Sequence, residues 1–448
     1  MGVGTAHISP ARPSRQLFTS RFGVVMSFIG VAVGLGNVWR FPYMVGAFGG
    51  GAFLLVYLVL LCGFGIPAIL AELTLGRMTG RSTMGAFARV GMPGGRAVGW
   101  LLFVTVLMAT SYYTVIVGWV LKYLVISLTG EIMSISPESF FNSVLGGFAG
   151  QFLMTGIVVL LAGIVLVLGI RKGVERISTV GMPLLFLLLL VLIGRSAMLP
   201  GAAEGFHFYL VPDFAKINSG VLTAALGQVF FSLSLGGTFL VTYASYLPEH
   251  VNLKRTAITV GIGETLAAVL AGFVIVPAAV AFGLEMSSGP PLTFVTAPAI
   301  FEQIPAGAVF AALFFGLLFF AAFLSDVAAL EVLVSAASDE LGMPRNRAVL
   351  IFCIATLVLG SIGMVSLDYI LKSDLVWGSI MQPVGSALAL VALAWVVGQG
   401  RALEAANVGN DDAPVGKVWL FWIKWVVPAG IALILALGVK GLFEAFVT

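Results

Sequence analysis

The chain has 448 residues, of which 60% are hydrophobic and only 10% are charged. A soluble protein carries about 25% charged residues, so this composition excludes a soluble globular domain and indicates a polytopic helical membrane protein. The net charge is +3, and there is no basic patch with interleaved aromatic residues, which argues against nucleic-acid binding. Both cysteines lie in apolar runs, so no disulfide framework is expected.

Long apolar segments follow one another along the chain, and most are joined by short loops. About 20 apolar residues suffice to span a bilayer as a helix. The first 20 residues are polar and the first apolar run is long, which does not fit a cleavable signal peptide. Hydropathy predicts eleven spanning helices, at roughly 22–46, 52–76, 97–127, 150–170, 176–199, 221–247, 257–286, 305–338, 347–366, 374–398 and 417–443.

Positive charges distinguish the two sides of the predicted membrane. Cytoplasmic loops of membrane proteins carry an excess of Lys and Arg. One side receives most of these residues, in six segments: Arg12, Arg15, Arg21; Arg77, Arg81, Arg89, Arg96; Arg171, Lys172, Arg176; Lys254, Arg255; Arg345, Arg347; Arg401, Lys417. This bias predicts a cytoplasmic N-terminus, and an odd number of spans then predicts an extracytoplasmic C-terminus.

Glycine interrupts the first predicted span. Gly30, Gly34 and Gly36 precede Asn37, and Pro42 follows. Glycine weakens a helix and proline disturbs it, and a broken helix in a bilayer must face protein or a polar cavity. We therefore predict that residues 31–36 form an unwound binding segment in mid-membrane. The alternative is a small-residue surface for helix packing.

The sixth predicted span has the same character, because Ser232 and Ser234 precede Gly236 and Gly237. The serines could simply bond back to their own helix. Two broken helices at matching positions are, however, typical of transporters built from inverted repeats, although no residue-level repeat is visible here. We predict one transmembrane domain over residues 1–448, with a first repeat at about 15–200, a second at about 215–400 and an extra helix at about 417–443.

Charged residues inside spans are expensive and are functional candidates by default. The predicted spans contain Arg40, Glu72, Glu264 and Asp326. Glu72 lies five residues before Arg77, which favours a structural ion pair. A buried carboxylate must be paired, bound to a metal ion or protonated, so Glu264 and Asp326 are candidates for an ion or proton site.

Several motifs together resemble the neurotransmitter:sodium symporters, specifically bacterial amino-acid transporters of the leucine-transporter type. They are GLGNVWRFPY at 34–43, GGGAF at 49–53, GQVFFSLSLG at 227–236, TYASY at 242–246 and PAIF at 298–301. The resemblance covers about residues 15–400. It implies an all-α polytopic membrane protein with a five-plus-five inverted repeat, in which broken helices 1 and 6 hold an amino acid and two sodium ions.

The resemblance implies a first sodium site built from the Ala32 carbonyl, Asn37, Ser232 and the substrate carboxylate. Glu264 stands where the family usually has asparagine, unless the alignment slips by one residue and places Gly263 there. An ionised glutamate could bind sodium and could also supply the negative charge that chloride provides in animal relatives.

A second sodium site would use the carbonyls of Gly30, Val33 and Ala321 and the hydroxyl of Ser325. The family usually has two adjacent hydroxyl ligands in span eight, and here the first of them is Leu324. Hard cations prefer oxygen ligands, and a leucine side chain offers none. The number of bound sodium ions, one or two, stays open.

Tyr113 matches the tyrosine that binds the substrate carboxylate in this family, and Phe231 matches its aromatic lid. Gly34 replaces the aspartate of monoamine transporters, which argues for an α-amino acid. Small residues, Ala109, Gly237 and Ala329, stand where leucine-selective members have bulky ones, which favours an aromatic or long aliphatic side chain. The expected substrate-binding residues are Ala32, Gly34, Gly36, Ala109, Tyr113, Phe231, Ser232, Ser234, Gly237, Ser325 and Ala329.

Charged residues on either side of this site resemble the gates of the family. Arg40 matches the outer gate arginine, and Asp368 or Asp374, which precede span ten, could pair with it. The resemblance favours Asp368. Arg15 and Asp339 match the cytoplasmic gate pair.

These observations predict a sodium-coupled symporter that imports a hydrophobic, bulky or aromatic amino acid across the plasma membrane by alternating access, without an organic cofactor. One alternative is proton or single-sodium coupling, suggested by Glu264, Asp326 and Leu324. A non-transporting amino-acid sensor or channel is another, although such a protein would usually carry a large soluble domain. An enzyme is not expected, because the histidines lie in the tail or loops and no nucleophile–base pair is visible.

Overall fold

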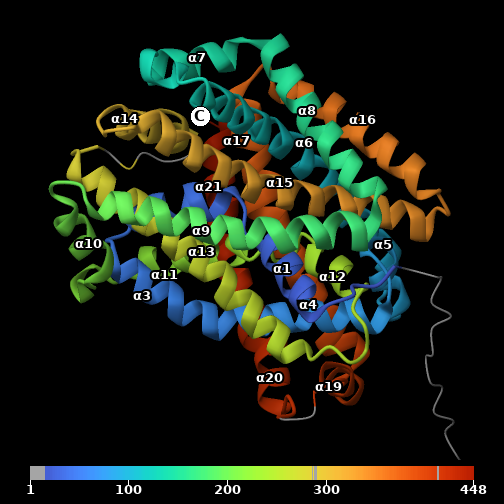
Figure 1. Cartoon of the computed structure of the whole chain (residues 1–448). Helices are drawn as coiled ribbons and strands as arrows, with labels where there is room; N and C mark the ends of the chain where they lie inside the picture. Colours follow the sequence, from blue (N-terminus) through green and yellow to red (C-terminus); the bar gives the residue numbers. More distant parts are fainter. Residues whose placement is uncertain (1–15, 285, 287–289, 411–412, 448) are drawn as a thin grey trace, which may run out of the picture.

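The computed structural model describes residues 16–284, 286, 290–410 and 413–447, which form a bundle of helices (Figure 1). Over these residues the β-structure is limited to an isolated bridge between Gly50 and Pro212. The predicted all-α class is therefore confirmed.

Helical segments occupy every predicted span. In chain order they are α1 (Arg21–Ala32), η1 (Gly36–Arg40) and α2 (Phe41–Ala47); α3 (Gly51–Leu60), η2 (Leu61–Gly65) and α4 (Ile66–Thr79); α6 (Gly95–Leu128); α8 (Phe148–Val167); η4 (Ile170–Glu175) and α9 (Arg176–Ala197); α11 (Ser219–Ser232) and α12 (Phe239–Ala244); α13 (Leu253–Ala281); α15 (Gly307–Glu340); α16 (Arg345–Gly363); α17 (Leu367–Ser373), η7 (Asp374–Ile380), α18 (Met381–Val391) and η8 (Ala392–Val397); and α20 (Lys417–Phe421), η9 (Trp422–Val426) and α21 (Val427–Val447).

Shorter helices lie in the connections between these segments. They are α5 (Thr83–Arg89), η3 (Glu131–Ser134), α7 (Pro137–Gly146), α10 (Ala202–Leu210), η5 (Phe214–Lys216), η6 (Leu292–Thr296), α14 (Ala297–Glu302) and α19 (Gln399–Asn407).

The number of membrane crossings depends on how the broken helices are counted. Among the described residues, nine helices are long and apolar enough to cross a membrane, and a tenth span results if α1 and the helix at Gly36–Ala47, bent by 58°, are taken together. Helices α11 and α12 are too short to pass this test. The multi-pass arrangement is confirmed, whereas the count of eleven stays a prediction.

The two longest helices, α6 and α15, have 34 residues each and pack extensively against one another. Helices α8 and α16 pack on α6 and on each other, at the upper right of Figure 1. Helix α1 packs against α9, α13 and α15. The broken first span therefore runs through the interior of the bundle.

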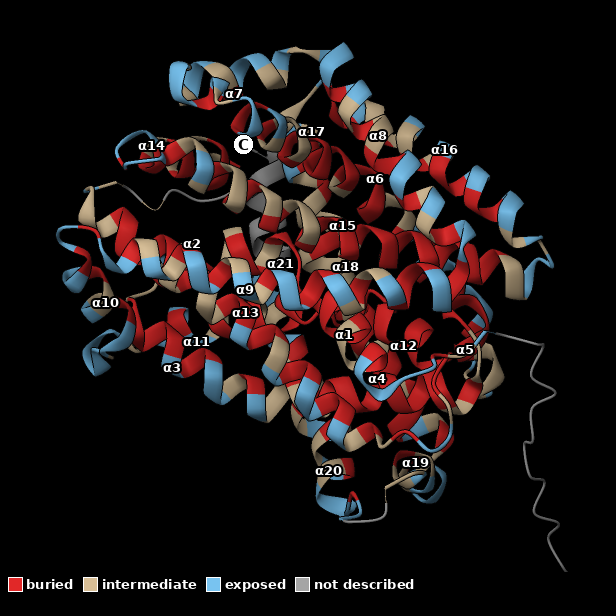
Figure 2. Ribbon diagram, in the orientation of Figure 1, coloured by how far each residue is buried: buried red, intermediate tan, exposed pale blue. Residues whose placement is uncertain are grey.

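Burial follows this arrangement, with buried residues in the centre and exposed ones on the outer helices (Figure 2). The outer face of α16 exposes Leu350, Ile354 and Val358, each by more than half of its surface. Burying apolar surface is worth about 25 cal/mol per Å², so a face of this kind would be unfavourable in water. A continuous apolar exterior is the surface that a membrane protein presents to lipid.

The N-terminal end of α1 is held by a carboxylate from η4. Glu175 accepts hydrogen bonds from the backbone N–H groups of Thr19 (3.1 Å) and Ser20 (3.0 Å). A Cβ on Gly23 would overlap this carboxylate, so glycine is required for the close approach. Glu175 thereby fixes the start of the broken span against the fifth span.

Candidate functional site

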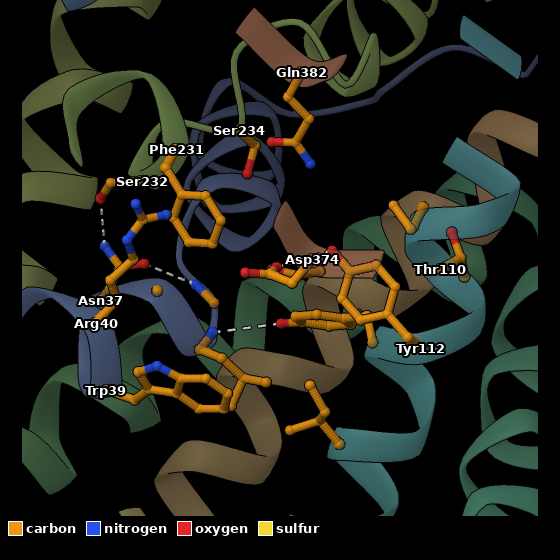
Figure 3. A pocket seen from close by; sticks show the side chains of 18 of the residues that line it. Asn37, Trp39, Arg40, Thr110, Tyr112, Phe231, Ser232, Ser234, Asp374 and Gln382 are labelled. Carbon is orange, nitrogen blue, oxygen red and sulfur yellow. Dashed lines mark hydrogen bonds between the residues drawn. The ribbon is translucent and has the colours of Figure 1, made fainter. Parts of the chain in front are cut away.

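A cavity of about 130 Å³ lies beside the two broken helices. For scale, a cavity of about 150 Å³ in another protein accommodates benzene. Figure 3 shows side chains from several helices converging on this space. The lining residues are Ala32, Gly34, Leu35, Gly36, Asn37, Trp39, Arg40, Ala109, Thr110, Tyr112, Tyr113, Ile116, Phe231, Ser232, Ser234, Phe239, Pro290, Ser325, Ala329, Ile370, Leu371, Asp374 and Gln382.

The first break lies inside the predicted segment 31–36. Helix α1 ends at Ala32, because Val33 is extended with φ −80° and ψ 113°. The Gly34 N–H then donates to the Asn37 side-chain oxygen (2.9 Å), and the Asn37 N–H donates to the Gly34 carbonyl (3.2 Å). Asn37 thus holds the unwound turn in shape from within the same segment.

The second break begins where α11 ends, at Ser232. The Leu235 N–H donates to the Phe230 carbonyl and the Ser234 N–H to the Phe231 carbonyl, both at 3.1 Å. This is a Schellman motif, in which glycine usually occupies the left-handed position. Here Ser234 occupies it, with φ 53°, a conformation uncommon for residues other than glycine. The termination turns the Ser234 side chain toward the cavity (Figure 3).

Glu72 stabilises the second break and does not form the predicted ion pair with Arg77. Its carboxylate accepts a hydrogen bond from the Gly236 N–H (2.8 Å), in the unwound stretch between α11 and α12. Arg77 instead donates to backbone carbonyls, including that of Val251 at 2.6 Å. The prediction failed because an unwound backbone segment offers an unpaired donor that sequence spacing on one helix does not reveal.

The Glu264 carboxylate, on α13, accepts hydrogen bonds from four elements, its own helix included. The Asn37 side-chain N–H donates to its Oε1 at 2.5 Å, and the Ser232 hydroxyl donates to the same oxygen. Thr265 (3.1 Å) and Tyr57 (3.4 Å) donate to its Oε2. The carboxylate is fully buried, and this many donors suit an ionised group.

Gly263 occupies a different environment from Glu264. A Cβ on Gly263 would meet the Ile29 side chain, so this residue faces α1 and not the cluster around Asn37. Of the two adjacent residues, Glu264 is therefore the one that lies beside Asn37 and Ser232.

Ser325, on α15, contacts the carbonyls freed by the first break. Its hydroxyl lies 3.2 Å from the Val31 oxygen and 3.0 Å from the Val33 oxygen. Leu324 is buried, and a Cβ on Gly30 would lie 3.3 Å from its Cδ1. The region in which a second ion was expected is therefore bounded by a methyl group on the side facing Gly30.

Tyr113, on α6, reaches the unwound backbone. The Leu35 N–H donates to its hydroxyl at a long 3.4 Å. A Cβ on Gly34 would lie 3.1 Å from the Tyr113 hydroxyl and 2.9 Å from the Ser325 hydroxyl. Glycine at position 34 therefore leaves space in front of both hydroxyls.

The small residues of the cavity wall are only partly as predicted. Ala109 and Ala329 line the cavity, but Gly237 does not. A Cβ on Gly237 would overlap the ring of Phe239, and that ring is what lines the cavity. The absence of a side chain at position 237 makes room for the Phe239 ring and does not widen the cavity.

Phe231 covers one side of the cavity. A Cβ on Gly36 would lie 2.7 Å from its ring, so the ring rests on a glycine of η1. The guanidinium carbon of Arg40 lies 4.1 Å from the ring centroid, in cation–π geometry. Figure 3 shows the Phe231 ring and the Arg40 side chain close together.

Arg40 and Asp374 both line the cavity. The Asp374 carboxylate also accepts a hydrogen bond from the Tyr112 hydroxyl (2.9 Å). Asp368, the partner favoured by the resemblance, instead pairs with Lys372 at 2.9 Å and is largely exposed. In this structure the prediction of Asp368 is wrong, because α17 presents Asp368 to its own i+4 neighbour.

Only half of the predicted cytoplasmic gate can be described. Arg15 lies outside the described residues. The Asp339 carboxylate accepts a hydrogen bond from the Ser82 N–H (3.3 Å), and its backbone carbonyl accepts one from Arg81 (3.1 Å). Asp339 therefore contacts the residues just before α5.

Asp326 does not line the cavity, although its charge made it a candidate. It is fully buried, and its Oδ1 lies 2.6 Å from the Thr114 hydroxyl of α6. Conversely, sequence reasoning did not select Gln382 or Thr110, which do line the cavity. A polar residue in an apolar span is a recognisable signal for Gln382, but Thr110 gives none, because its hydroxyl bonds to its own helix at Val106 (2.6 Å).

Comparison with known proteins gives consistent similarities. The sequence model of the sodium:neurotransmitter symporter family matches residues 15–144 and 143–442. A sodium-dependent transporter of Haemophilus influenzae is 34% identical over 96% of this chain and 98% of its own length, and one of Bacillus subtilis is 31% identical over 93% and 96%. The crystal structure of MhsT in complex with L-phenylalanine superimposes with a TM-score of 0.85, at 33% identity over 94% of this chain and 99% of MhsT.

These matches cover both broken helices, the cavity between them and the Glu264 cluster. They also agree with the motifs around Asn37 and Ser232, which carried the resemblance. The chain therefore belongs to the sodium:neurotransmitter symporter family, whose members are transporters and not enzymes.

Proposed function

We propose that this protein is a sodium-coupled symporter that carries a hydrophobic amino acid into the cell by alternating access. The observation that carries the proposal is the group of Asn37, Ser232 and Glu264 beside the cavity, because it combines an anionic charge with neutral oxygen atoms. MhsT, the structural relative, is bound to an amino acid, which supports the same substrate class here.

One sodium ion would bind the Ala32 carbonyl together with Asn37, Ser232 and Glu264. Such oxygen atoms suit a hard cation. Asn37 Oδ1 accepts from the Gly34 N–H and keeps a second lone pair for the ion. The substrate carboxylate would complete the site, so that sodium and substrate each bind more tightly when the other is present. The fixed charge of Glu264 would replace a chloride ion.

We propose a stoichiometry of one sodium ion per substrate. The second predicted set comprises Gly30, Val33, Ala321 and Ser325, and Leu324 adds an apolar group to it. The Ser325 hydroxyl is also engaged with backbone carbonyls. A cation there would lack one of the usual hydroxyl ligands.

The substrate carboxylate would lie against Gly34 and bind the Tyr113 hydroxyl. The side chain would then extend toward Ala109, Ala329 and the Phe239 ring, all of which line the cavity. This apolar wall favours a bulky or aromatic side chain. Ala32, Gly36 and Ser234, which also line the cavity, would shape the site through backbone and small side-chain contacts.

Outer closure would draw Arg40 and Asp374 together above Phe231. Inner opening would separate the N-terminal end of α1 from the region around Asp339, and Arg15 is the proposed partner there. The two inverted repeats at about 15–200 and 215–400, the cytoplasmic N-terminus and the extracytoplasmic C-terminus remain part of this proposal.

Uptake by proteoliposomes tests the proposal. Each of the twenty amino acids is offered with an inward sodium gradient, and again with sodium replaced by another monovalent cation. We expect sodium-dependent accumulation of tryptophan, tyrosine, phenylalanine or leucine. Accumulation that follows a pH gradient and ignores sodium would overturn sodium coupling, and the absence of uptake of every amino acid would overturn the substrate class.

A further inference from the structure

Gln382, on α18, presents a free amide to the cavity. It lines the cavity and is half-buried, and Figure 3 shows it beside Ser234. Within the described chain its side chain makes no hydrogen bond. An amide has two donors and two acceptor lone pairs, and leaving them unsatisfied in a partly enclosed site is unfavourable. Water or a ligand must therefore satisfy this group.

Backbone packing explains why Gln382 reaches the cavity. Gly236, in the second break, has φ 81°, and a Cβ there would overlap the Gln382 carbonyl oxygen. A Cβ on Gly385 would in turn overlap the Gly236 carbonyl oxygen. Two glycines thus allow α18 to lie directly against the unwound segment. Gln382 is fixed by this contact and does not sit on a mobile loop.

Several other residues of the same cavity wall have side chains that are engaged with the backbone or are apolar. Thr110 donates its hydroxyl to the Val106 carbonyl, and Ser234 directs its hydroxyl toward the Val31 carbonyl at 3.4 Å. Ala109 and Ala329 bring no polar side-chain atom. A hydrocarbon substrate would cover the Gln382 amide without replacing the hydrogen bonds that water makes to it.

We infer that Gln382 is a specificity-determining residue that hydrogen-bonds a neutral polar atom on the substrate side chain. The inference rests on the proposed function and deepens it, because it selects among bulky substrates. A phenol O–H or an indole N–H matches the amide oxygen, so tyrosine and tryptophan are preferred over phenylalanine. The neutral Gln382 amide itself offers no counter-charge, so a charged side chain gains less from this residue than a neutral polar one.

The test is sodium-dependent equilibrium binding to the purified full-length protein. Dissociation constants are measured for tyrosine, tryptophan and phenylalanine with the wild type and with Gln382→Leu. One net hydrogen bond corresponds to about a 2- to 12-fold difference in affinity. We expect Gln382→Leu to reduce the tyrosine-to-phenylalanine affinity ratio by that factor while phenylalanine binds at least as tightly as before.

Gln303→Leu is the matched control, because Gln303 is exposed at the end of α14 and donates to the Ala299 carbonyl. It should leave the ratio unchanged. If Gln382→Leu does not yield folded protein, Gln382→Met keeps the side-chain length and serves the same purpose. An unchanged ratio in a binding-competent variant overturns the inference alone. If the wild type binds none of the three amino acids, the proposed function fails, and this inference fails with it.

Discussion

The two regions in which sodium was expected differ in what surrounds the unwound part of the first span. On the α13 side, the Glu264 carboxylate receives donors from Asn37, Ser232, Tyr57 and Thr265. On the α15 side, Ser325 is the polar side chain, and its neighbour Leu324 is apolar. One region is organised around a charge, and the other is organised around a hydroxyl and a methyl group.

Shared backbone geometry therefore does not make two equivalent ion sites. Both regions use carbonyls freed by the same break in α1, and freed carbonyls supply only partial charges. A buried cation also needs a compensating charge or several oxygen ligands. The side chains contributed by α13 and α15 therefore decide which region can hold an ion. Four variants test this difference.

The largest effect on sodium affinity is expected for Glu264→Gln. Removing a unit charge about 4 Å from a cation costs about 4 kcal/mol at an effective dielectric constant of 20, so sodium affinity should fall by about a thousandfold. Sodium titration of substrate binding measures this. Glu264→Asp, which keeps the charge, is the control and should lose much less. If chloride partly restores sodium binding to Glu264→Gln, the carboxylate acts as a fixed replacement anion. Unaltered sodium affinity would remove Glu264 from the ion site.

A smaller loss is expected for Tyr113→Phe. The variant removes a hydrogen bond to a substrate carboxylate, worth about 1.5–3 kcal/mol, without changing the shape of the site. Calorimetry at saturating sodium gives the substrate affinity directly. Tyr112→Phe is the matched control, because its hydroxyl contacts Asp374 and should affect closure more than affinity. Equal substrate affinity in Tyr113→Phe and wild type would refute the assignment of Tyr113.

Leu324→Thr should strengthen sodium binding in the region beside α15. A threonine hydroxyl adds the missing oxygen ligand, and we expect a gain of about 0.5–1.5 kcal/mol in sodium binding. The sodium dependence of uptake should become steeper, with a Hill coefficient that rises from about 1 toward 2. Leu324→Val keeps the position apolar and serves as the control. A wild type that already shows cooperative sodium dependence would contradict the proposed one-ion stoichiometry.

The smallest effect on sodium affinity is expected for Ser325→Ala. If no ion binds beside α15, this variant loses only the hydroxyl contacts to the Val31 and Val33 carbonyls. Stability should fall by about 0.5–1.5 kcal/mol, visible as a lower melting temperature, while the half-saturating sodium concentration stays within about twofold. A much larger loss of sodium affinity would show that the Ser325 region binds an ion after all.

Errors in the predicted site share a physical origin. Asp368 and Asp374 are the same residue type six positions apart, and only the packing of α17 and η7 places Asp374 on the cavity wall with Arg40 while Asp368 pairs with Lys372. The glycine at position 237 predicts a wider cavity, but the Phe239 ring occupies the space beside it. Glu72 lies five residues before Arg77 but accepts a hydrogen bond from the Gly236 backbone N–H. Only Glu72 finds its partner in another segment, whereas Asp368 pairs within its own helix and the Gly237 space is filled by a ring two residues away. All three outcomes depend on how the segments pack, which residue spacing along one helix cannot indicate.

The membrane class, the helical fold, the position of both breaks and the family could be predicted from the amino-acid sequence. The membrane class follows from the composition of the whole chain. The breaks and the family follow from glycine positions and short motifs, each of which involves only a few neighbouring residues. The partners of the charged residues, by contrast, depend on how the helices pack. In the packed bundle, hydrogen-bond donors surround Glu264, and Asp326 contacts Thr114 away from the cavity. Gln382 lies on the cavity wall because Gly236 and Gly385 allow α18 to approach the unwound segment. Electrostatic and hydrogen-bonding roles depend on distances between helices, and only the packed bundle sets those distances.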